Sequence, residues 1–365
     1  MTKQDWLRVL AVFIITTSVC AGVVGGVIYT KAKKQASQST GFVNVESSGE
    51  AEQPIEMVEV DSGEESGEIE PVYLGPNIFS GDARPIAVMI DNERPAWENH
   101  GGLNSAYMLY EFIIEGGESR IMAFFKNVNP DYIGPVRSAR HYFLDYAMEH
   151  DAIFTHFGWS PKAQSDIKTL GINNINGIYD TFYWRVPPKS SYHNAITSME
   201  NIKKQISTKG YRDTSERECI VKYNEHDEEL EKGEEATSIK VKYSALQNSS
   251  YEYDAERKVY LRSMRGIPHK DSQTGEQFYA KNIIMIKVKD MLLDDPEDKG
   301  RRELYNIGKG NGYFATNGKI IPITWEKDSR SGRTIYKDLY DNEIKVNDGI
   351  TWVQIVPITG EITYN

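Results

Sequence analysis

The loss of helical patterning after about residue 235 is the feature that most constrains the fold of this chain. Seven short runs rich in β-branched and aromatic residues follow, separated by turn-forming residues. Asn317-Gly318 joins two of these runs through the residue pair that a two-residue hairpin turn requires. We therefore expect a mainly β domain over residues 235–365, with strands at 238–243, 258–262, 282–289, 312–316, 319–325, 333–337 and 350–356.

Residues 71–234 alternate between strand-like and helix-like patterns, which is typical of an α+β or α/β domain with a mixed sheet. Residues 85–91 form an apolar run that ends in polar residues and predict a buried strand. Two further apolar runs, 107–115 and 120–126, flank a glycine-rich turn and predict a hairpin. Another strand is expected at 152–157.

Three helices are expected in the same domain. Apolar residues at helical spacing predict one helix over 137–149. A second helix should begin at Ser160-Pro161 and end before Gly171, because proline favours the first turn and glycine the residue after the last one. Thr197 and Glu200 have the spacing of a capping box and predict a third helix that ends near Gly210.

The amino-terminal region predicts attachment to a membrane. Residues 9–29 contain no charged residue, and about twenty such residues span a bilayer core of roughly 30 Å. We interpret them as a single transmembrane helix that follows a cytoplasmic tail, residues 1–8, and places the rest of the chain outside the cytoplasm. Val19 stands where a lipoprotein signal needs a small residue, so we interpret Cys20 as a residue of the membrane helix. The sequence does not decide whether Cys20 is ever lipidated.

Residues 30–70 have the composition of a disordered acidic tether. Between Gly41 and Glu70 there are ten acidic residues and no basic one. The whole chain has a formal net charge of −11, and the remainder carries no excess of basic residues. We therefore expect no nucleic-acid partner. Cys219 is the only cysteine after Cys20, as suits an extracytoplasmic protein that avoids stray thiols.

The run IGPVRSAR, residues 133–140, is the strongest candidate for function. Pro135 predicts the start of a helix, and a turn of helix would bring Arg137 and Arg140 onto one face. Free backbone N–H groups at a helix start favour an anion, and the two guanidinium groups would add forked donors for carboxylate or phosphate. The alternative is an ordinary helix start whose arginines pair with nearby acids.

Other candidate residues follow the predicted strands, because ligands often bind where the strands of a sheet end. The full candidate ligand-binding set is Asp91, Asn92, Arg120, Arg137, Ser138, Arg140, His156, His193, Asn194, Arg265 and His269. A structural salt-bridge network is the alternative interpretation of the acid and the arginines. His156 alone is typical of a hydrogen-bonded structural histidine, and Ser138 of a helix cap rather than a nucleophile.

Known catalytic and metal-binding motifs are absent from the sequence. It has no Cys-x-x-Cys, no paired histidines at helical spacing and no phosphate-cradling Gly-Lys-Ser/Thr loop, so we assign no catalytic residue and expect no metal site. A dense set of aromatic residues precedes Pro187-Pro188 and could stack on sugar rings or form a domain interface: Trp159, Tyr179, Phe182, Tyr183 and Trp184.

Several segments resemble the YerB-like bacterial lipoprotein family. PIAVMIDN (85–92), EGGESR (115–120), IGPVRSAR (133–140) and YHN (192–194) are similar to its amino-terminal part, and residues 262–285 and 317–327 to its carboxy-terminal part. The family consists of two linked domains of unknown function 3048 in membrane-attached proteins of Gram-positive bacteria. The resemblance implies a location more than a chemistry. Members commonly carry a lipobox cysteine, from which this chain departs at Val19.

Two functions follow as hypotheses. The first is an envelope protein without catalytic activity that binds an acidic cell-wall polymer, or a partner in envelope synthesis, through an Arg-lined site. The second is an envelope phosphotransferase or hydrolase acting on phosphate-linked glycans, with arginines holding a diphosphate and Asp91 a divalent metal. The order of its motifs is loosely similar to that of wall-polymer ligases of the LytR-CpsA-Psr family. The sequence leaves open whether the protein is an enzyme, and a cofactor is expected only under the second hypothesis.

Overall fold

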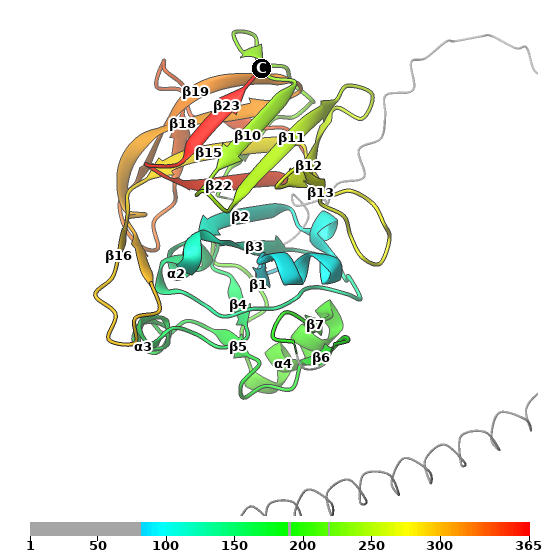
Figure 1. Ribbon diagram of the computed structural model, residues 1–365, viewed down its shortest axis with the longest axis vertical. Helices are drawn as coiled ribbons and strands as arrows, with labels where there is room; N and C mark the ends of the chain where they lie inside the picture. The colour runs from blue at the N-terminus through cyan, green and yellow to red at the C-terminus, as the bar shows by residue number, and fades with distance from the viewer. Residues whose placement is uncertain (1–81, 189–190, 218–219) are drawn as a thin grey trace, which may run out of the picture. The chain divides into compact units, whose positions relative to one another are not determined.

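The computed structural model describes residues 82–188, 191–217 and 220–365 (Figure 1). The predicted cytoplasmic tail (1–8), transmembrane helix (9–29) and tether (30–70) lie outside this part of the chain, as do Cys20 and Cys219. Among the residues that are described, no helix has both the length and the apolar character needed to cross a membrane.

A mixed sheet of eleven strands contains strands from both halves of the chain (Figure 1). Its order is β20-β19-β18-β15-β22-β2-β3-β1-β4-β5, and β9 pairs with β19. Its strands are β1 (Ile86–Asp91), β2 (Met108–Ile113), β3 (Ser119–Phe125), β4 (Ile153–His156), β5 (Asn174–Asn176), β9 (Glu234–Glu235), β15 (Asn282–Val288), β18 (Gly308–Thr316), β19 (Lys319–Lys327), β20 (Ile335–Lys337) and β22 (Thr351–Pro357).

The two halves meet at a parallel strand pair in the middle of this sheet. β2 pairs with β22 in the register Met108↔Thr351 to Phe112↔Ile355. Every residue of both strands is buried, which explains why both read as continuous apolar runs rather than alternating ones. The predicted boundary at residues 234 and 235 therefore separates two kinds of sequence pattern, while the hydrogen-bonded sheet continues across it.

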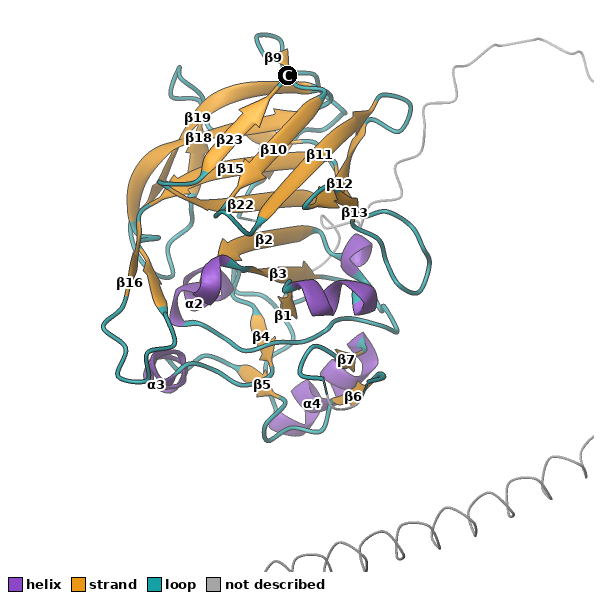
Figure 2. Ribbon diagram, viewed as in Figure 1, coloured by secondary structure: helices purple, strands orange, loops and turns teal. Residues whose placement is uncertain are grey.

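A second, antiparallel sheet lies across the strands of the second half (Figure 2). The ring of Trp352 in β22 contacts that of Tyr251 in this sheet, with ring centroids 6.4 Å apart. The order is β13-β12-β11-β10-β23, with β14 paired to β12. Its strands are β10 (Ser238–Lys242), β11 (Asn248–Asp254), β12 (Val259–Met264), β13 (Ile267–Pro268), β14 (Tyr279–Ala280) and β23 (Glu361–Tyr364).

All helices of the described residues belong to the first half (Figure 2). The fold is therefore a mixed sheet with few helices followed by a mainly β part, as the sequence predicts. The helices are η1 (Arg94–Asn99), η2 (Leu103–Ser105), η3 (Glu115–Gly117), η4 (His141–Phe143), α2 (Leu144–Glu149), α3 (Pro161–Thr169) and α4 (Met199–Lys209). Three two-stranded ladders complete the structure: β6 (Tyr183–Arg185) with β7 (Ala195–Thr197), β8 (Lys222–Tyr223) with β21 (Lys345–Val346), and β16 (Asp290–Leu292) with β17 (Arg302–Leu304).

Local signals in the sequence located several elements correctly. β2 and β3 form the expected antiparallel hairpin. α3 begins at Pro161, and the Ser160 hydroxyl accepts a hydrogen bond from the Ala163 N–H, as an N-cap should. Asn317 and Gly318 have φ values of 49° and 76°, which is the left-handed pair that the tight turn between β18 and β19 needs.

The predicted helix over 137–149 is wrong in its first part. Residues 133–140 are extended, and a helix begins only with η4 at His141. The Arg137 N–H donates to the Met89 carbonyl (2.9 Å), and the Arg137 carbonyl accepts a hydrogen bond from the Phe157 N–H (3.0 Å). A helix would pair that carbonyl with the N–H of residue 141, so neighbouring segments take a bond that the helix would need. Arg137 is therefore not part of a helix, while Arg140 is the N-cap residue of η4 and makes no side-chain cap hydrogen bond.

The expected cap of α4 is also displaced by one residue. Ser198, not Thr197, is the N-cap, and its hydroxyl accepts a hydrogen bond from the Asn201 N–H. Thr197 ends β7, and its hydroxyl donates to the Phe182 carbonyl at 2.7 Å. Ser and Thr are both good caps, so the sequence did not distinguish the two positions.

A buried ion pair connects the second sheet to the first. Arg262 of β12 donates to the Glu111 carboxylate of β2 at 2.8 Å, and both side chains are 0% exposed. The Arg262 guanidinium also donates to the Tyr251 hydroxyl at 2.6 Å and lies 4.1 Å from the ring centre of Trp352. The Glu111 carboxylate accepts further hydrogen bonds from Asn92, Ser119, Gln247 and Ser249. Neither charge is left without partners, as burial requires.

This pair generates a stability prediction. Arg262→Met would leave the Glu111 carboxylate buried without a cation, so we expect the free energy of unfolding to fall by about 3–5 kcal/mol. Arg257→Met is the matched control, because Arg257 forms an exposed pair with Glu276, and it should cost less than about 1 kcal/mol. Urea unfolding of the full chain in detergent micelles, followed by tryptophan fluorescence, measures both. Equal losses in the two variants would contradict the prediction.

Candidate functional site

The structure brings several of the predicted site residues together at the end of β1. Asp91 ends that strand and is paired in register with Arg120 at the beginning of β3. The extended segment 133–140 runs beside it, with Val136 bridged to Ile90, and carries Arg137 to the same point. His193 reaches it from the loop before β7. We call Asp91, Glu93, Arg120, Arg137 and His193 the strand-end cluster.

Asp91 is the centre of this cluster. It is completely buried, and its Oδ2 accepts a hydrogen bond from His193 Nδ1 at 2.8 Å. The same oxygen lies 3.0 Å from Arg137 Nε, while Oδ1 accepts a hydrogen bond from the Glu93 N–H at 3.1 Å. One carboxylate therefore holds two cationic side chains and the turn that follows β1.

The pKa values in the cluster follow from these contacts. Burial alone would raise the pKa of Asp91, but the hydrogen bond from His193 and the charges of Arg137 and Arg120 together bring it below its usual value. The hydrogen bond to Asp91 raises the pKa of His193 against a smaller opposing effect of burial. The aspartate is thus ionised at neutral pH, and the contact with it stabilises the charged form of His193 relative to a free imidazole.

Glu93 bridges the two arginines at the surface of the cluster. Its Oε1 lies 3.8 Å from Nη2 of Arg120 and 3.8 Å from Nη2 of Arg137, which is longer than a hydrogen bond. The Glu93 side chain is 28% exposed and that of Arg137 24%, whereas Arg120 is almost fully buried. A water-accessible carboxylate therefore stands loosely between two guanidinium groups.

Arg120 is held rigidly although it is not fully hydrogen-bonded. Its Nη1 donates to the Ser138 carbonyl at 2.7 Å, while its buried Nε makes no hydrogen bond within the described residues. Burial, and next the charge of Arg140, lower the pKa of Arg120 to about 10, so it stays charged at neutral pH.

Arg140 lies next to the cluster but is occupied by another acid. It donates to both oxygens of Glu115, at 2.5 and 2.9 Å, in a two-pronged pair. On an extended segment, residues three apart point to opposite faces, so Arg137 and Arg140 do not share a partner. Arg120, Arg137 and Arg140 each lie within ion-pair distance of an acidic side chain. These contacts correspond to the alternative interpretation of the sequence, in which the arginines pair with nearby acids.

A cation would have to compete for the same oxygens. Asp91, Glu93 and His193 each offer a ligand atom within 4.8 Å of the others. However, Asp91 Oδ2 already contacts His193 and Arg137, so a metal ion here would have to displace a guanidinium group. The donor set suits an anion beside the arginines better than a cation beside Asp91.

Three predicted residues have contacts outside the cluster. His156 is buried with its ring nitrogens 2.8 Å from the Gly158 carbonyl and 3.2 Å from Asn174 Oδ1, and burial lowers its pKa to about 4. The amide nitrogen of Asn194 donates to the Val186 and Pro188 carbonyls. The hydroxyl of Ser138 donates to the Phe157 carbonyl, and no helix is present for it to cap.

Arg265 and Asn92 are tied to the two sheets instead. Arg265 pairs with Glu118 and donates to Gln247 Oε1 at 3.0 Å. Asn92 is fully buried and donates to Glu111 and Ser119.

His269 is connected to Asp91 through a residue that the sequence did not indicate, His100. Arg262 Nε donates to His269 Nδ1 at 3.1 Å, so the proton of neutral His269 is on Nε2. That nitrogen lies 2.5 Å from His100 Nδ1, and His100 Nε2 lies 2.5 Å from the Asp91 carbonyl oxygen. Both rings are buried, and burial lowers the pKa of His100 to about 4. Each neutral ring therefore accepts one hydrogen bond and donates one, and together they fix the end of β1.

Glu93 and Glu115 were also missed by sequence reasoning. Glu93 lies two residues beyond Asp91 at the same strand end, and Glu115 begins the glycine-rich turn, so proximity in sequence was a usable signal for both. His100 gave no such signal, because its partner His269 is 169 residues away.

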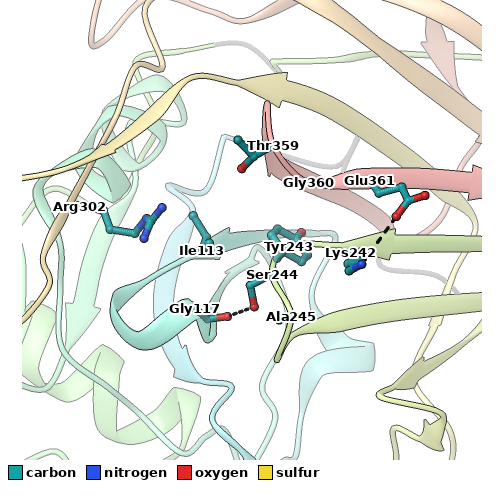
Figure 3. A pocket seen from close by; sticks show the side chains of 10 residues that line it. All are labelled: Ile113, Gly117, Lys242, Tyr243, Ser244, Ala245, Arg302, Thr359, Gly360 and Glu361. Carbon is teal, nitrogen blue, oxygen red and sulfur yellow. Dashed lines mark hydrogen bonds and ion pairs between the residues drawn. The ribbon is translucent and has the colours of Figure 1, made fainter.

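A cavity of about 310 Å³ borders the β2–β3 turn (Figure 3). Lys242 and Arg302 line it, but Lys242 lies 3.8 Å from Glu361 and Arg302 donates to Asp290 at 3.0 Å. None of the predicted site residues lines this cavity. Its cations are paired, and we assign it no function.

The fold and the cluster define a two-part protein whose halves share one sheet and whose polar cluster lies at a strand end. Residues 77–212 match the family "Protein of unknown function (DUF3048) N-terminal domain", and residues 239–353 match "Protein of unknown function (DUF3048) C-terminal domain". The chain belongs to the DUF3048 family, which confirms the resemblance seen in the sequence.

One curated relative and one solved structure illustrate the relationship. The chain is 30% identical over 282 residues to "Putative lipoprotein YerB" of Bacillus subtilis (strain 168), covering 76% of this chain and 82% of that protein. The crystal structure of the YerB protein from Bacillus subtilis matches with a TM-score of 0.68 at 28% identity, covering 77% of this chain and 94% of that chain.

The His193–Asp91 contact predicts a pH dependence. Because the pKa of His193 in the folded protein is raised above 6.5, the stabilisation from this pair is complete below about pH 6.5 and is lost as the pH rises through the folded-state pKa. We expect NMR titration of the His193 ring to give a midpoint above 6.5, and Asp91→Asn to lower it. His156, with a pKa of about 4, is the internal control. A His193 midpoint at or below 6.5 would argue against the ion pair.

Proposed function

We propose that this protein is a membrane-anchored extracytoplasmic protein of a Gram-positive cell envelope that binds a phosphate-bearing anionic wall polymer at the strand-end cluster. The similarity to a protein named as a putative lipoprotein supports the envelope location. The uncharged residues 9–29 support an anchor in the membrane, with the folded part outside the cytoplasm.

The position of Glu93 is the observation that carries the proposal. Its carboxylate stands between the guanidinium groups of Arg120 and Arg137 at 3.8 Å from each, partly exposed to water. A phosphodiester has one negative charge, as this carboxylate has, and its two non-bridging oxygens can each face one guanidinium group. It would replace the two long contacts by charge-assisted hydrogen bonds of normal length.

The charge balance favours an anion once Glu93 turns away. Arg120, Arg137 and Arg140 then oppose only Asp91 and Glu115, and the raised pKa of His193 adds positive charge in part of the molecules. When another anion replaces the Glu93 carboxylate, no buried charge is left unpaired. This exchange should therefore cost less free energy than the separation of a buried ion pair.

One specific observation favours the alternative of a phosphotransferase or hydrolase. Asp91, Glu93 and His193 form a group with the spacing of metal ligands, which catalysis with a divalent ion would need. Under this alternative, turnover of phosphate-linked glycans requires Mg²⁺ or Mn²⁺ and is lost in Asp91→Asn. Binding without turnover supports our proposal instead.

Two substitutions test the binding site in opposite directions. We expect Arg137→Ala to weaken binding by roughly 1.5–3 kcal/mol, or about ten- to a hundredfold, because it removes a charged donor. Glu93→Gln should tighten binding several-fold, because it removes the competing carboxylate. The measurement is co-sedimentation of the full chain in nanodiscs with isolated cell walls that carry phosphate-linked polymer.

Walls stripped chemically of that polymer and the variant Lys162→Ala, an exposed cation of α3 outside the cluster, are the controls. Neither the loss of Lys162 nor the loss of Glu93 should weaken binding. If Glu93→Gln binds no better than the wild type and Arg137→Ala binds no worse, the strand-end cluster is not the site.

A further inference from the structure

A second cavity, of about 420 Å³, lies where the two parts of the chain meet. Residues 102–105 and 130–132 of the first part form one side, and residues of the 271–279 segment form the other. Its volume lies in the range of roughly 300–1,000 Å³ that is usual for small-molecule sites. None of the strand-end cluster lines it.

The lining of this cavity is polar and aromatic, without a lysine or an arginine. Tyr132 and Tyr279 contribute rings, and apart from Gly102 and Pro130 the remaining side chains carry hydroxyl, amide or carboxylate groups. The Ser105 hydroxyl and the Asp131 carboxylate make no hydrogen bond to any residue that the structure describes. The amide of Gln273 donates only to its neighbour Ser272. Donors and acceptors are thus available, but positive charge is not.

The carboxylates of the cavity do not form a cation site. Asp271 accepts hydrogen bonds from the N–H groups of Gly102 (2.7 Å), Gln273 (2.8 Å) and Thr274 (3.2 Å), so both its oxygens hold the loop. Glu276 is bound by Asn104 and by Arg257. Only Asp131 remains free, which is too few oxygen ligands for a metal ion. The lining equally disfavours an anion.

Tyr132 offers an oriented ring to the cavity. Its hydroxyl donates to the Asn99 carbonyl at 3.1 Å, and its ring lies edge-to-face with that of Trp184, 6.2 Å between centroids. Gly101 lies against it, because a Cβ at that position would be 2.5 Å from Tyr132 Cδ1. The ring is therefore fixed before any ligand binds, which reduces the entropic cost of binding.

We infer that this cavity binds a neutral sugar residue of a glycan. A pyranose ring presents C–H groups that stack on an aromatic face, and hydroxyl groups that hydrogen-bond to amide, hydroxyl and carboxylate side chains. It needs no positive charge from the protein. The fixed Tyr132 ring supplies the first kind of contact, and the Ser105 hydroxyl, the Asp131 carboxylate and the Gln273 amide, which is bonded only to its neighbour, supply the second.

The cavity is connected to the strand-end cluster through Asn99. Its carbonyl accepts the hydrogen bond from Tyr132, and its amide donates to the His193 carbonyl at 3.5 Å. A polymer that alternates sugars with phosphates would place a sugar in the cavity and a phosphate at Arg137. The inference deepens the proposed function and rests on it only for the identity of this polymer.

Neutral oligosaccharides test the cavity alone. The probes are trisaccharides of glucose, galactose, N-acetylglucosamine and N-acetylgalactosamine, titrated by NMR against the full chain in nanodiscs. We expect at least one of them to bind, Tyr132→Ala to weaken it by about tenfold, and Tyr132→Phe to retain it because the ring remains. Gln273→Ala, at an exposed position, should weaken binding several-fold without affecting folding.

Two controls separate this inference from the proposed function. Tyr340→Ala removes a 69% exposed ring that does not line the cavity and should leave binding unchanged. Arg137→Ala should weaken polymer binding about ten- to a hundredfold without changing the affinity for the neutral trisaccharide. Failure of all four probes to bind the wild type, or equal binding by the wild type, Tyr132→Ala and Gln273→Ala, would overturn the inference.

Discussion

The buried pair of Glu111 and Arg262 is the interaction on which the rest of the structure depends. It joins β2 of the large sheet to β12 of the second sheet, and both charges are removed from water. Such a pair is stable only when every remaining donor and acceptor is satisfied. The groups that hydrogen-bond to this pair include Asn92, the residue after Asp91, and His269. His269 contacts His100, and His100 in turn contacts the Asp91 carbonyl. The position of the strand-end cluster is thus a consequence of how the two sheets are joined.

Within the cluster, charge is balanced rather than left open. Asp91 forms an ion pair with Arg137 and a hydrogen bond with His193, Glu115 holds Arg140 through two hydrogen bonds, and Glu93 makes only long contacts. The free-energy cost of displacing an acid by an incoming anion therefore differs strongly among Asp91, Glu115 and Glu93. Glu93 is the acid that an anion would displace at the lowest cost, because its side chain is already 28% exposed. This asymmetry supports the proposal that phosphate binds at the position of Glu93.

Sequence patterns predicted elements wherever a local signal decided them. The hairpin of β2 and β3, the Asn317-Gly318 turn and the start of α3 at Pro161 all depend on residues close together in the chain. The error at 137–149 has the opposite origin, because the backbone of Arg137 bonds to Met89 and to Phe157, which are far from it in the chain. Helical spacing of apolar side chains was present there, but distant strands supplied better hydrogen bonds for the backbone.

The sequence by itself determined the family, the mixed-sheet and mainly β character of the two parts, and the concentration of charged side chains at strand ends. These properties follow from residue types and short spacings, whose effects do not depend on contacts with distant parts of the chain. Only the tertiary structure decided that the two parts share one sheet, that each arginine has a particular acid as its partner, and that His100 links His269 to Asp91. Such contacts join residues far apart in the chain, and their energies depend on burial, which no local pattern contains.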